Sequence, residues 1–180
     1  MLRPMARAFT VLLSSAGRRV ALLRIFREAL RSLGLDGRVL ASDLSPTAAA
    51  FHDADQGVLV PRVTAPDYVE RTLDLCARHG IDLVVPLIDP ELAVLAAARP
   101  RFEAAGVEVH VGSPAVCAIG SDKTLTHRWL VDAGLPTVKQ ALASDVVEGQ
   151  QWSFPALIKP SRGSSSIGVR TVASLSLIHI

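Results

Sequence analysis

Short apolar segments alternate with amphipathic stretches through the first part of the chain. The apolar segments are rich in Val, Leu and Ala and lie at residues 9–13, 38–41, 57–60, 83–86 and 107–111. Helical periodicity marks stretches between them, at residues 18–33, 67–79 and 90–105. Apolar strands that alternate with helices are typical of a parallel sheet covered on both faces. The pattern therefore predicts an α/β fold with a Rossmann-like parallel sheet.

The first amphipathic stretch shows the helical spacing most clearly. Val20, Leu23, Phe26 and Leu30 recur at steps of three and four residues, which places them on one face of a helix. Gly34 follows as a helix stop signal. We therefore predict a helix whose apolar face packs against the sheet.

The pattern changes beyond Gly112, where a Ser-Pro pair and a short apolar stretch follow. Ser121 is then predicted to be the N-cap of a helix that ends near Gly134. We place a domain boundary near residue 115. A first domain then covers residues 1–114, and an incomplete α+β subdomain covers residues 115–174.

Within this second part we expect a short strand at residues 137–141 and a polar connector at residues 144–152. Two further apolar strands are predicted on either side of a Gly/Ser loop. We expect the last six residues, 175–180, to be non-native, because they match one translated frame of a sequencing-library adaptor. An ordinary edge strand is the alternative for this tail.

Composition narrows the classes of function. Hydrophobic residues make up 49% of the 180, but no apolar run approaches the roughly 18 residues of a membrane span. The net charge is +2 and aromatic residues make up 4%, which favours small-molecule partners over nucleic acid. Cys76 and Cys117 lack CxxC spacing and the histidines lack metal-ligand spacing. We therefore expect free thiols in a reducing cytoplasm and no metal site in this chain.

The Gly/Ser loop carries the clearest candidate chemistry. An apolar strand leads into Lys159, and the loop then supplies flexible backbone, hydroxyls and a further cation. Its candidate ligand-binding members are Ser161, Arg162, Gly163, Ser164, Ser165, Ser166 and Gly168. Such groups together suit the phosphates of a nucleotide. The lysine precedes the glycines, so the loop is not of the GxxxxGK[ST] class, and a plain hairpin without ligand is the alternative.

Lysine is scarce in this chain. Of 19 basic residues only Lys123, Lys139 and Lys159 are lysines. A compact ammonium contacts phosphate in a way that a guanidinium does not reproduce. We therefore predict that Lys123, which follows Asp122 at a helix start, joins Lys159 in a nucleotide site. A surface lysine in the first turn of a helix is the alternative.

Two parts of the chain resemble one superfamily. Residues 154–168 resemble the glycine-rich region of ATP-grasp enzymes. Residues 12–19 and 85–92 are similar to the preceding domain of proteins related to the carbamoyl-phosphate synthase large subunit. The resemblance covers nearly the whole chain up to Ser174. It implies that Lys123 and Lys159 contact ATP and that the loop is a mobile flap over the phosphates.

The turn after the first strand is a candidate substrate site. Ser15, Gly17 and Arg18 lie between the first strand and the first helix, at the edge where open parallel sheets bind ligands. We predict that Ser15 and the helix N-terminus bind an anionic substrate group, with Arg18 adding positive charge. A capped helix with solvated arginines is the alternative.

Acidic residues follow two other predicted strands at the same edge. Asp43 ends the second strand, and Asp89 and Glu91 come after the fourth. They are candidate substrate ligands. The alternative is helix capping, because Asp89 followed by Pro90 has the form of an N-cap with proline at the first helical position.

The resemblance implies an ATP-dependent ligase that activates a carboxylate. Such an enzyme phosphorylates a carboxylate or bicarbonate with MgATP, and an amine-type nucleophile then displaces phosphate. The superfamily holds Mg²⁺ with carboxylates and an asparagine downstream of the loop, whereas no acidic residue follows Glu148 here. We therefore expect an N-terminal fragment that binds ATP at most. The alternatives are a nucleotide-binding module without chemistry and a dinucleotide-dependent oxidoreductase domain, which the missing GxGxxG disfavours.

Overall fold

The computed structural model describes residues 8–146 and 152–174. The tail at residues 175–180, for which a non-native origin is predicted, lies outside the described residues. The chain divides into two compact units, residues 1–114 and residues 115–180. Each unit contains its own sheet.

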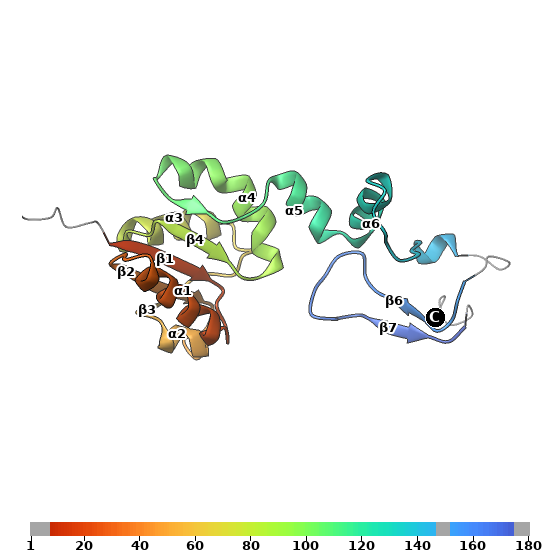
Figure 1. Ribbon diagram of the computed structural model, residues 1–180, viewed down its shortest axis with the longest axis horizontal. Coiled ribbons are helices and arrows are strands. Elements are labelled where there is room, and N and C mark those ends of the chain that lie inside the picture. The colour runs from red at the N-terminus through yellow and green to blue at the C-terminus, as the bar shows by residue number, and fades with distance from the viewer. Residues whose placement is uncertain (1–7, 147–151, 175–180) are drawn as a thin grey trace, which may run out of the picture. The chain divides into compact units, whose positions relative to one another are not determined.

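A parallel five-stranded sheet forms the centre of the first unit (Figure 1). Its strands, in the spatial order β3-β2-β1-β4-β5, are β1 (Phe9–Ser14), β2 (Gly37–Asp43), β3 (Gln56–Leu59), β4 (Leu83–Pro86) and β5 (Glu108–Val109). The helices are α1 (Val20–Ser32), α2 (Ala49–Asp53), α3 (Tyr68–His79) and α4 (Asp89–Ala104). The predicted fold class is confirmed. Strand order reverses between β1 and β4, and open α/β sheets bind ligands at the carboxyl ends of strands at such a point.

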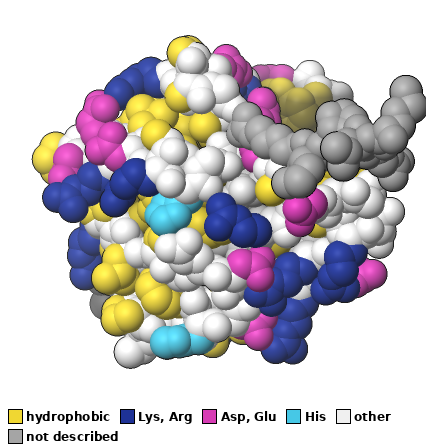
Figure 2. Space-filling view, turned by 90° about the vertical axis from the view of Figure 1, so that its left-hand side faces the viewer, with side chains coloured by type: hydrophobic (Ala, Val, Ile, Leu, Met, Phe, Trp, Pro, Cys, Tyr) yellow, Lys and Arg dark blue, Asp and Glu magenta, His cyan; other side chains and the backbone are white. Residues whose placement is uncertain are grey.

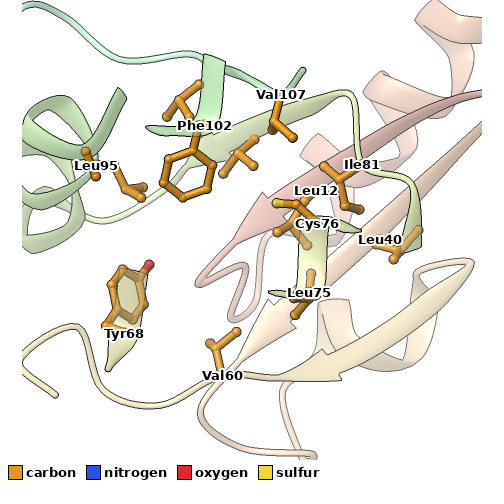
Figure 3. Packing of buried hydrophobic residues seen from close by; sticks show 13 residues of the cluster. Leu12, Leu40, Val60, Tyr68, Leu75, Cys76, Ile81, Leu95, Phe102 and Val107 are labelled. Atoms are coloured by element: carbon orange, nitrogen blue, oxygen red, sulfur yellow. The ribbon is translucent and has the colours of Figure 1, made fainter. Parts of the chain in front are cut away.

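Two helical layers cover the two faces of this sheet. Leu12 of β1 belongs to one core, with Leu75 of α3 and Phe102 of α4 (Figure 3). Its neighbour Val11 belongs to a second core, with Leu23 of α1. Successive strand side chains point to opposite faces, so a continuous apolar strand fills both cores.

The cysteines are buried and free. Cys76 of α3 lies in the same core as Leu12 and Phe102, and burial raises the pKa of its thiol to about 12. The thiol therefore stays protonated near neutral pH and acts as an apolar side chain.

The structure differs from the predicted elements in a few places. The short helix α2 was not predicted, and β5 covers only part of residues 107–111. Among the described strands, β5 is an edge strand that pairs only with β4, through Leu83 with Glu108 and Val84 with Val109. Val107 still packs into the core just before the strand begins.

The second unit contains α5 (Pro114–Ser121), α6 (Lys123–Asp132), a 3-10 turn at Ala143–Asp145, and the antiparallel strands β6 (Ala156–Ile158) and β7 (Arg170–Val172). The strand predicted at residues 137–141 is wrong. No described strand pairs with this stretch, and its backbone is not part of a ladder. The Gln140 side chain instead donates to the backbone carbonyl of Lys123 at 3.1 Å.

The surface of the molecule carries both signs of charge. On the face shown in Figure 2, basic and acidic side chains are interspersed. Some of the basic side chains pair with acidic neighbours, for example Arg24 with Asp53 and Arg101 with Glu70. Among the described residues, no helix has the length and apolar character needed to cross a membrane.

The contact between β3 and α2 gives a first testable expectation. A Cβ atom added at Gly57 would lie 2.5 Å from the backbone carbonyl oxygen of Phe51. Backbone cannot yield as a flexible side chain does, so Gly57→Ala must displace α2 or β3. We expect it to lower the free energy of unfolding of the first unit by about 2–3 kcal/mol. Urea denaturation followed by far-UV circular dichroism measures this change.

Gln56→Ala is the matched control, because Gln56 is the exposed neighbour on the same strand. We expect this control to unfold at nearly the wild-type urea concentration. Equal urea midpoints for Gly57→Ala and Gln56→Ala would show that the close contact between residue 57 and Phe51 does not require glycine.

Candidate functional site

In the second unit, two lysines line one cavity beneath the Gly/Ser loop. Lys159 follows the last residue of β6, and Lys123 is the first residue of α6. Both line a cavity of about 250 Å³ together with Gly163 and the serines Ser164, Ser165 and Ser166. Segments that lie far apart in the sequence thus place two ammonium groups beside one loop.

The loop is tied to the start of α6 by several contacts. The backbone N–H of Lys123 donates to the Ser161 carbonyl at 2.9 Å, and its Nζ donates to the Gly163 carbonyl at 3.0 Å. Arg162 Nε donates to Asp122 Oδ2 at 3.0 Å. The bond between Arg162 and Asp122 therefore ties the loop to the start of α6, and the Lys123 side chain contacts the loop backbone at Gly163.

Asp122 organises this junction. Its Oδ1 accepts from the backbone N–H groups of Thr124 and Leu125, so Asp122 is the N-cap of α6. The N-cap predicted at Ser121 is wrong by one residue, because Ser121 ends α5. The Arg162 guanidinium and these N–H groups hold the pKa of Asp122 below its ordinary value of 3.8. Asp122 is therefore a carboxylate near neutral pH.

The loop backbone uses the left-handed region repeatedly. Ser165 and Ser166 have φ values of 58° and 60°, where residues with a side chain are uncommon. Such conformations cost free energy and gather at ligand sites. A Cβ at Gly168 would lie 2.9 Å from Pro160 Cγ, so glycine permits the loop to close on itself there.

An apolar cavity adjoins the loop. It has a volume of about 140 Å³, and it shares Lys123, Lys159, Pro160 and Ser161 with the cavity under the loop. Its apolar lining includes Leu142, Val146, Trp152, Ala156 and Leu157. The pair of cavities can hold a ligand with an apolar ring at one end and anionic groups at the other. The sequence analysis missed Trp152 and Val146, since nothing in their local pattern indicates a cavity.

These residues do not form a magnesium site. Among residues 8–146 and 152–174, no group of three or more His, Cys, Asp or Glu side chains is placed to hold a metal ion. Asp122 is the carboxylate tied to the loop, and it already bonds two N–H groups and Arg162. Mg²⁺ needs several free oxygen ligands, so the described residues do not fit this ion.

In the first unit, the carboxyl ends of β1 and β4 border another cavity. It has a volume of about 420 Å³ and is lined by Ser15, Gly17, Arg18, Asp43 and Ile88, among others. Three predicted substrate residues, Ser15, Gly17 and Arg18, are therefore brought together.

Asp89 and Glu91, the other two predicted substrate residues, differ in their exposure to solvent. Asp89 is exposed, whereas Glu91 is fully buried. The alternative of Asp89 as the α4 N-cap is wrong, because Ile88 is the N-cap and no side chain caps this helix.

Glu91 is the centre of a buried hydrogen-bond network. Its Oε1 accepts from Ser14 Oγ at 2.6 Å, Ser15 Oγ at 2.7 Å and Tyr68 Oη at 2.7 Å. Ser42 Oγ donates onward to Ser14 Oγ at 3.4 Å. The sequence analysis missed Ser14, Ser42 and Tyr68. A serine at the end of an apolar strand and the chain's single tyrosine were the only signals.

Burial changes the acidity of the tyrosine in this network. Burial, followed by the negative charge of Glu91, raises the pKa of Tyr68 well above its ordinary value of 10.0. Tyr68 therefore keeps its hydroxyl proton, and this O–H group donates a hydrogen bond to Glu91 Oε1. The network is a fixed set of hydroxyl donors around one carboxylate oxygen.

The groups predicted to bind an anion at this edge already have partners. Ser15 Oγ donates to Glu91, and the Gly17 N–H donates to Asp43 Oδ2 at 2.8 Å. The N-cap of α1 is Arg19, without a side-chain cap. Two carboxylates thus occupy the donors that an anionic substrate group would need, and the positive charge that remains at the cavity comes from Arg18 and Arg19.

A Rossmann-like parallel sheet is followed along the chain by a lysine-bearing strand, a Gly/Ser loop and a second strand that pairs antiparallel with the first. Residues 11–110 match the family described as PylC-like, N-terminal domain, and the chain belongs to this family.

Curated relatives are D-alanine–D-alanine ligases. The protein of Mycobacterium ulcerans is 33% identical over 160 residues, which cover 77% of this chain and 42% of the relative. That of Corynebacterium aurimucosum is 29% identical over 99 residues, covering 52% of this chain and 28% of the relative. The chain thus spans less than half the length of these relatives.

Solved structures show the same fold. The L-amino acid ligase from Bacillus licheniformis has a TM-score of 0.65 at 21% identity. The biotin carboxylase domain of Hydrogenobacter thermophilus 2-oxoglutarate carboxylase, solved with MgADP, ADP and bicarbonate, has a TM-score of 0.64 at 21% identity. Each match covers 97% of this chain and 40% of the other.

Proposed function

We propose that this chain is the N-terminal part of an ATP-dependent ligase that activates a carboxylate as an acyl phosphate. The observation that carries the proposal is the convergence of Lys123, Lys159 and the Gly/Ser loop on one cavity. The ligase and carboxylase relatives support it. In this proposal the second unit binds ATP, and the cavity at the sheet edge of the first unit binds a substrate.

Each part of the nucleotide site has a role that follows from its chemistry. The Lys123 and Lys159 ammonium groups attract the phosphates, and the loop hydroxyls of Ser164, Ser165 and Ser166 donate to phosphate oxygens. The adjoining apolar cavity suits the adenine ring. Lys123 exchanges its bond to the Gly163 carbonyl for a phosphate oxygen when ATP binds.

The proposed reaction has two steps. A carboxylate oxygen of the substrate, or of bicarbonate, attacks the γ-phosphorus of ATP, and ADP leaves. An amine then attacks the carbonyl carbon of the acyl phosphate, and inorganic phosphate leaves as the C–N bond forms. Closure of the loop excludes water, which would otherwise hydrolyse the acyl phosphate. Mg²⁺, when bound, neutralises phosphate charge, and its ligands are proposed to lie outside this chain.

A nucleotide-binding module without chemistry is the second candidate. The observation that favours it is the lack of a metal-holding cluster among the described residues. Both candidates require the 180-residue chain to bind an adenine nucleotide.

Thermal unfolding of the chain with different nucleotides tests the proposal. We expect ADP and a non-hydrolysable ATP analogue to raise the Tm of the second unit, since a ligand at 100 times its Kd adds about 2.7 kcal/mol of stability. NAD at the same concentration serves as the control. Protection by NAD alone would favour the dinucleotide-binding alternative and would overturn the nucleotide site proposed here.

A further inference from the structure

Arg162 lies on Asp122 and outside both cavities of the second unit. It is not part of the lining of the cavity under the loop, nor of the apolar cavity beside it. Its Nε donates to Asp122 Oδ2 at 3.0 Å, and the Asp122 side chain is 13% exposed, against 74% for Arg162. Arg162, expected from the sequence to bind phosphate, therefore contacts the N-cap residue of α6 instead of the space open to a ligand.

The two carboxylate oxygens of Asp122 have separate partners. Oδ1 accepts from the backbone N–H groups of Thr124 at 2.9 Å and Leu125 at 3.3 Å, which are among the donors that a helix start leaves unpaired. Oδ2 accepts from Arg162. A substitution can therefore keep the cap on α6 and remove the contact with the loop.

The base of the loop, residues 161–163, is bonded to the same helix start. Asp122 and Arg162 form an antiparallel β-bridge, and the Lys123 N–H donates to the Ser161 carbonyl at 2.9 Å. Lys123 Nζ donates to the Gly163 carbonyl at 3.0 Å. Under the proposed function this ammonium moves to a phosphate, so the Ser161 bond and the Asp122–Arg162 pair remain to hold the base.

The tip of the loop, residues 164–167, makes only local hydrogen bonds among the described residues. The Ile167 N–H donates to the Ser164 carbonyl and the Val169 N–H donates to the Ser166 carbonyl, each at 3.3 Å. The side chains of the tip are exposed, Ile167 at 76%. The tip can therefore move without breaking a bond to α6.

Glycines with positive φ flank the tip. Gly163 has a φ of 124° and Gly168 a φ of 76°. Glycine populates positive and negative φ about equally well, so the backbone at either end of the tip can rotate. The tip has a hinge on each side, whereas the base is tied to a helix.

We infer that Asp122 and Arg162 form a latch that keeps the base of the loop on α6, and that the tip alone is the lid over the cavity. Both are positioning residues, because they hold the backbone around Lys123 and touch no ligand. The identity of the ligand under the lid rests on the proposed function. The latch itself is measured without any ligand.

The first test is amide hydrogen exchange, followed by NMR on the full 180-residue chain without nucleotide. We expect the Lys123 N–H to be protected and the Ile167 N–H to exchange rapidly. Asp122→Asn keeps an oxygen for the cap but turns an NH₂ donor toward Arg162, and Arg162→Ala removes the guanidinium. We expect each to lower the protection of the Lys123 N–H about fivefold, and the double variant to lower it no further, because all three break one pair.

Asp132→Asn and Arg170→Ala are the matched controls, because they remove the same charges from exposed positions on α6 and β7. We expect both to keep wild-type protection at Lys123, and Arg162→Lys to restore most of it by keeping a cation near Asp122. Unchanged protection in Asp122→Asn and Arg162→Ala overturns the latch. So does a wild-type Lys123 N–H that exchanges as fast as that of Ile167.

Calorimetric titration with a non-hydrolysable ATP analogue distinguishes the latch from direct phosphate binding by Arg162. The latch predicts that Asp122→Asn and Arg162→Ala weaken binding by the same factor and that the double variant weakens it no further. If Arg162→Ala alone lost affinity, while Asp122→Asn bound as tightly as the wild type, Arg162 would be a phosphate ligand and the latch would be wrong.

The two measurements also separate this inference from the proposed function. A latch seen in hydrogen exchange, in a chain that does not bind the analogue, would refute the nucleotide site and leave the latch standing. Analogue binding with no effect of either variant on exchange at Lys123 would do the reverse.

Discussion

Lys159→Ala is expected to weaken the binding of a non-hydrolysable ATP analogue to the chain by roughly 30- to 150-fold. The side chain lines the cavity under the loop from the end of β6. A charge-assisted contact to phosphate contributes about 2–3 kcal/mol, and no other residue of the β6 strand end can replace it. Isothermal titration calorimetry measures the loss directly, and the protection seen in thermal unfolding should disappear in parallel.

Arg128→Ala is the control for this variant. It removes one positive charge from an exposed position on α6 in the same unit, so it tests whether net charge alone explains the effect. We expect its affinity for the analogue to stay within about twofold of the wild type, because exposed charges are screened by salt. If Lys159→Ala bound the ATP analogue with wild-type affinity, Lys159 would not be a nucleotide-binding residue.

Glu91→Ala is expected to lower the free energy of unfolding of the first unit by about 2–5 kcal/mol. The substitution removes the acceptor shared by Ser14, Ser15 and Tyr68. Two of these donors are nearly fully buried, Ser14 at 1% and Tyr68 at 2% exposure, and each buried donor left without a partner costs about 1–3 kcal/mol. Urea denaturation followed by far-UV circular dichroism gives the value.

Glu91→Gln is the matched control for Glu91→Ala, because it keeps an acceptor oxygen on a side chain of the same length. The amide oxygen keeps the three hydroxyl bonds and the substitution removes a buried charge, so we expect the variant to be at least as stable as the wild type. Stability in Glu91→Ala equal to that of Glu91→Gln would show that the hydroxyl donors find other partners. Ser14 and Tyr68, whose oxygens lie 3.5 Å apart, are the pair to inspect in that case.

Much of the first unit's fold could be predicted from the sequence. Both faces of a parallel sheet are buried, so its strands appear in the sequence as continuous apolar runs. Val11 and Leu12 illustrate this, because these neighbours pack into different cores. The failed strand at residues 137–141 shows the limit of such patterns. A strand exists only where a partner strand satisfies its backbone, and that partner is a property of the whole fold.

The candidate nucleotide site was partly visible in the sequence. The lysine ahead of the Gly/Ser loop and the scarcity of lysine both pointed to Lys159 and Lys123, and the structure places these two on one cavity. The apolar cavity beside it could not be predicted. Its Trp152 and Val146 come from a connector without periodicity, and only the path of that connector brings them to β6.

The sequence by itself determined the class of fold and the position of the Gly/Ser loop that we propose binds phosphate, because both depend on residue types at short, regular spacing. Only the tertiary structure decided that Glu91 is buried and Asp89 exposed, and that Ser14 and Tyr68 converge on Glu91. These partners lie 77 and 23 residues away in the sequence. Their contact requires the sheet to bring the end of β1 and the starts of α3 and α4 together, which no local pattern encodes.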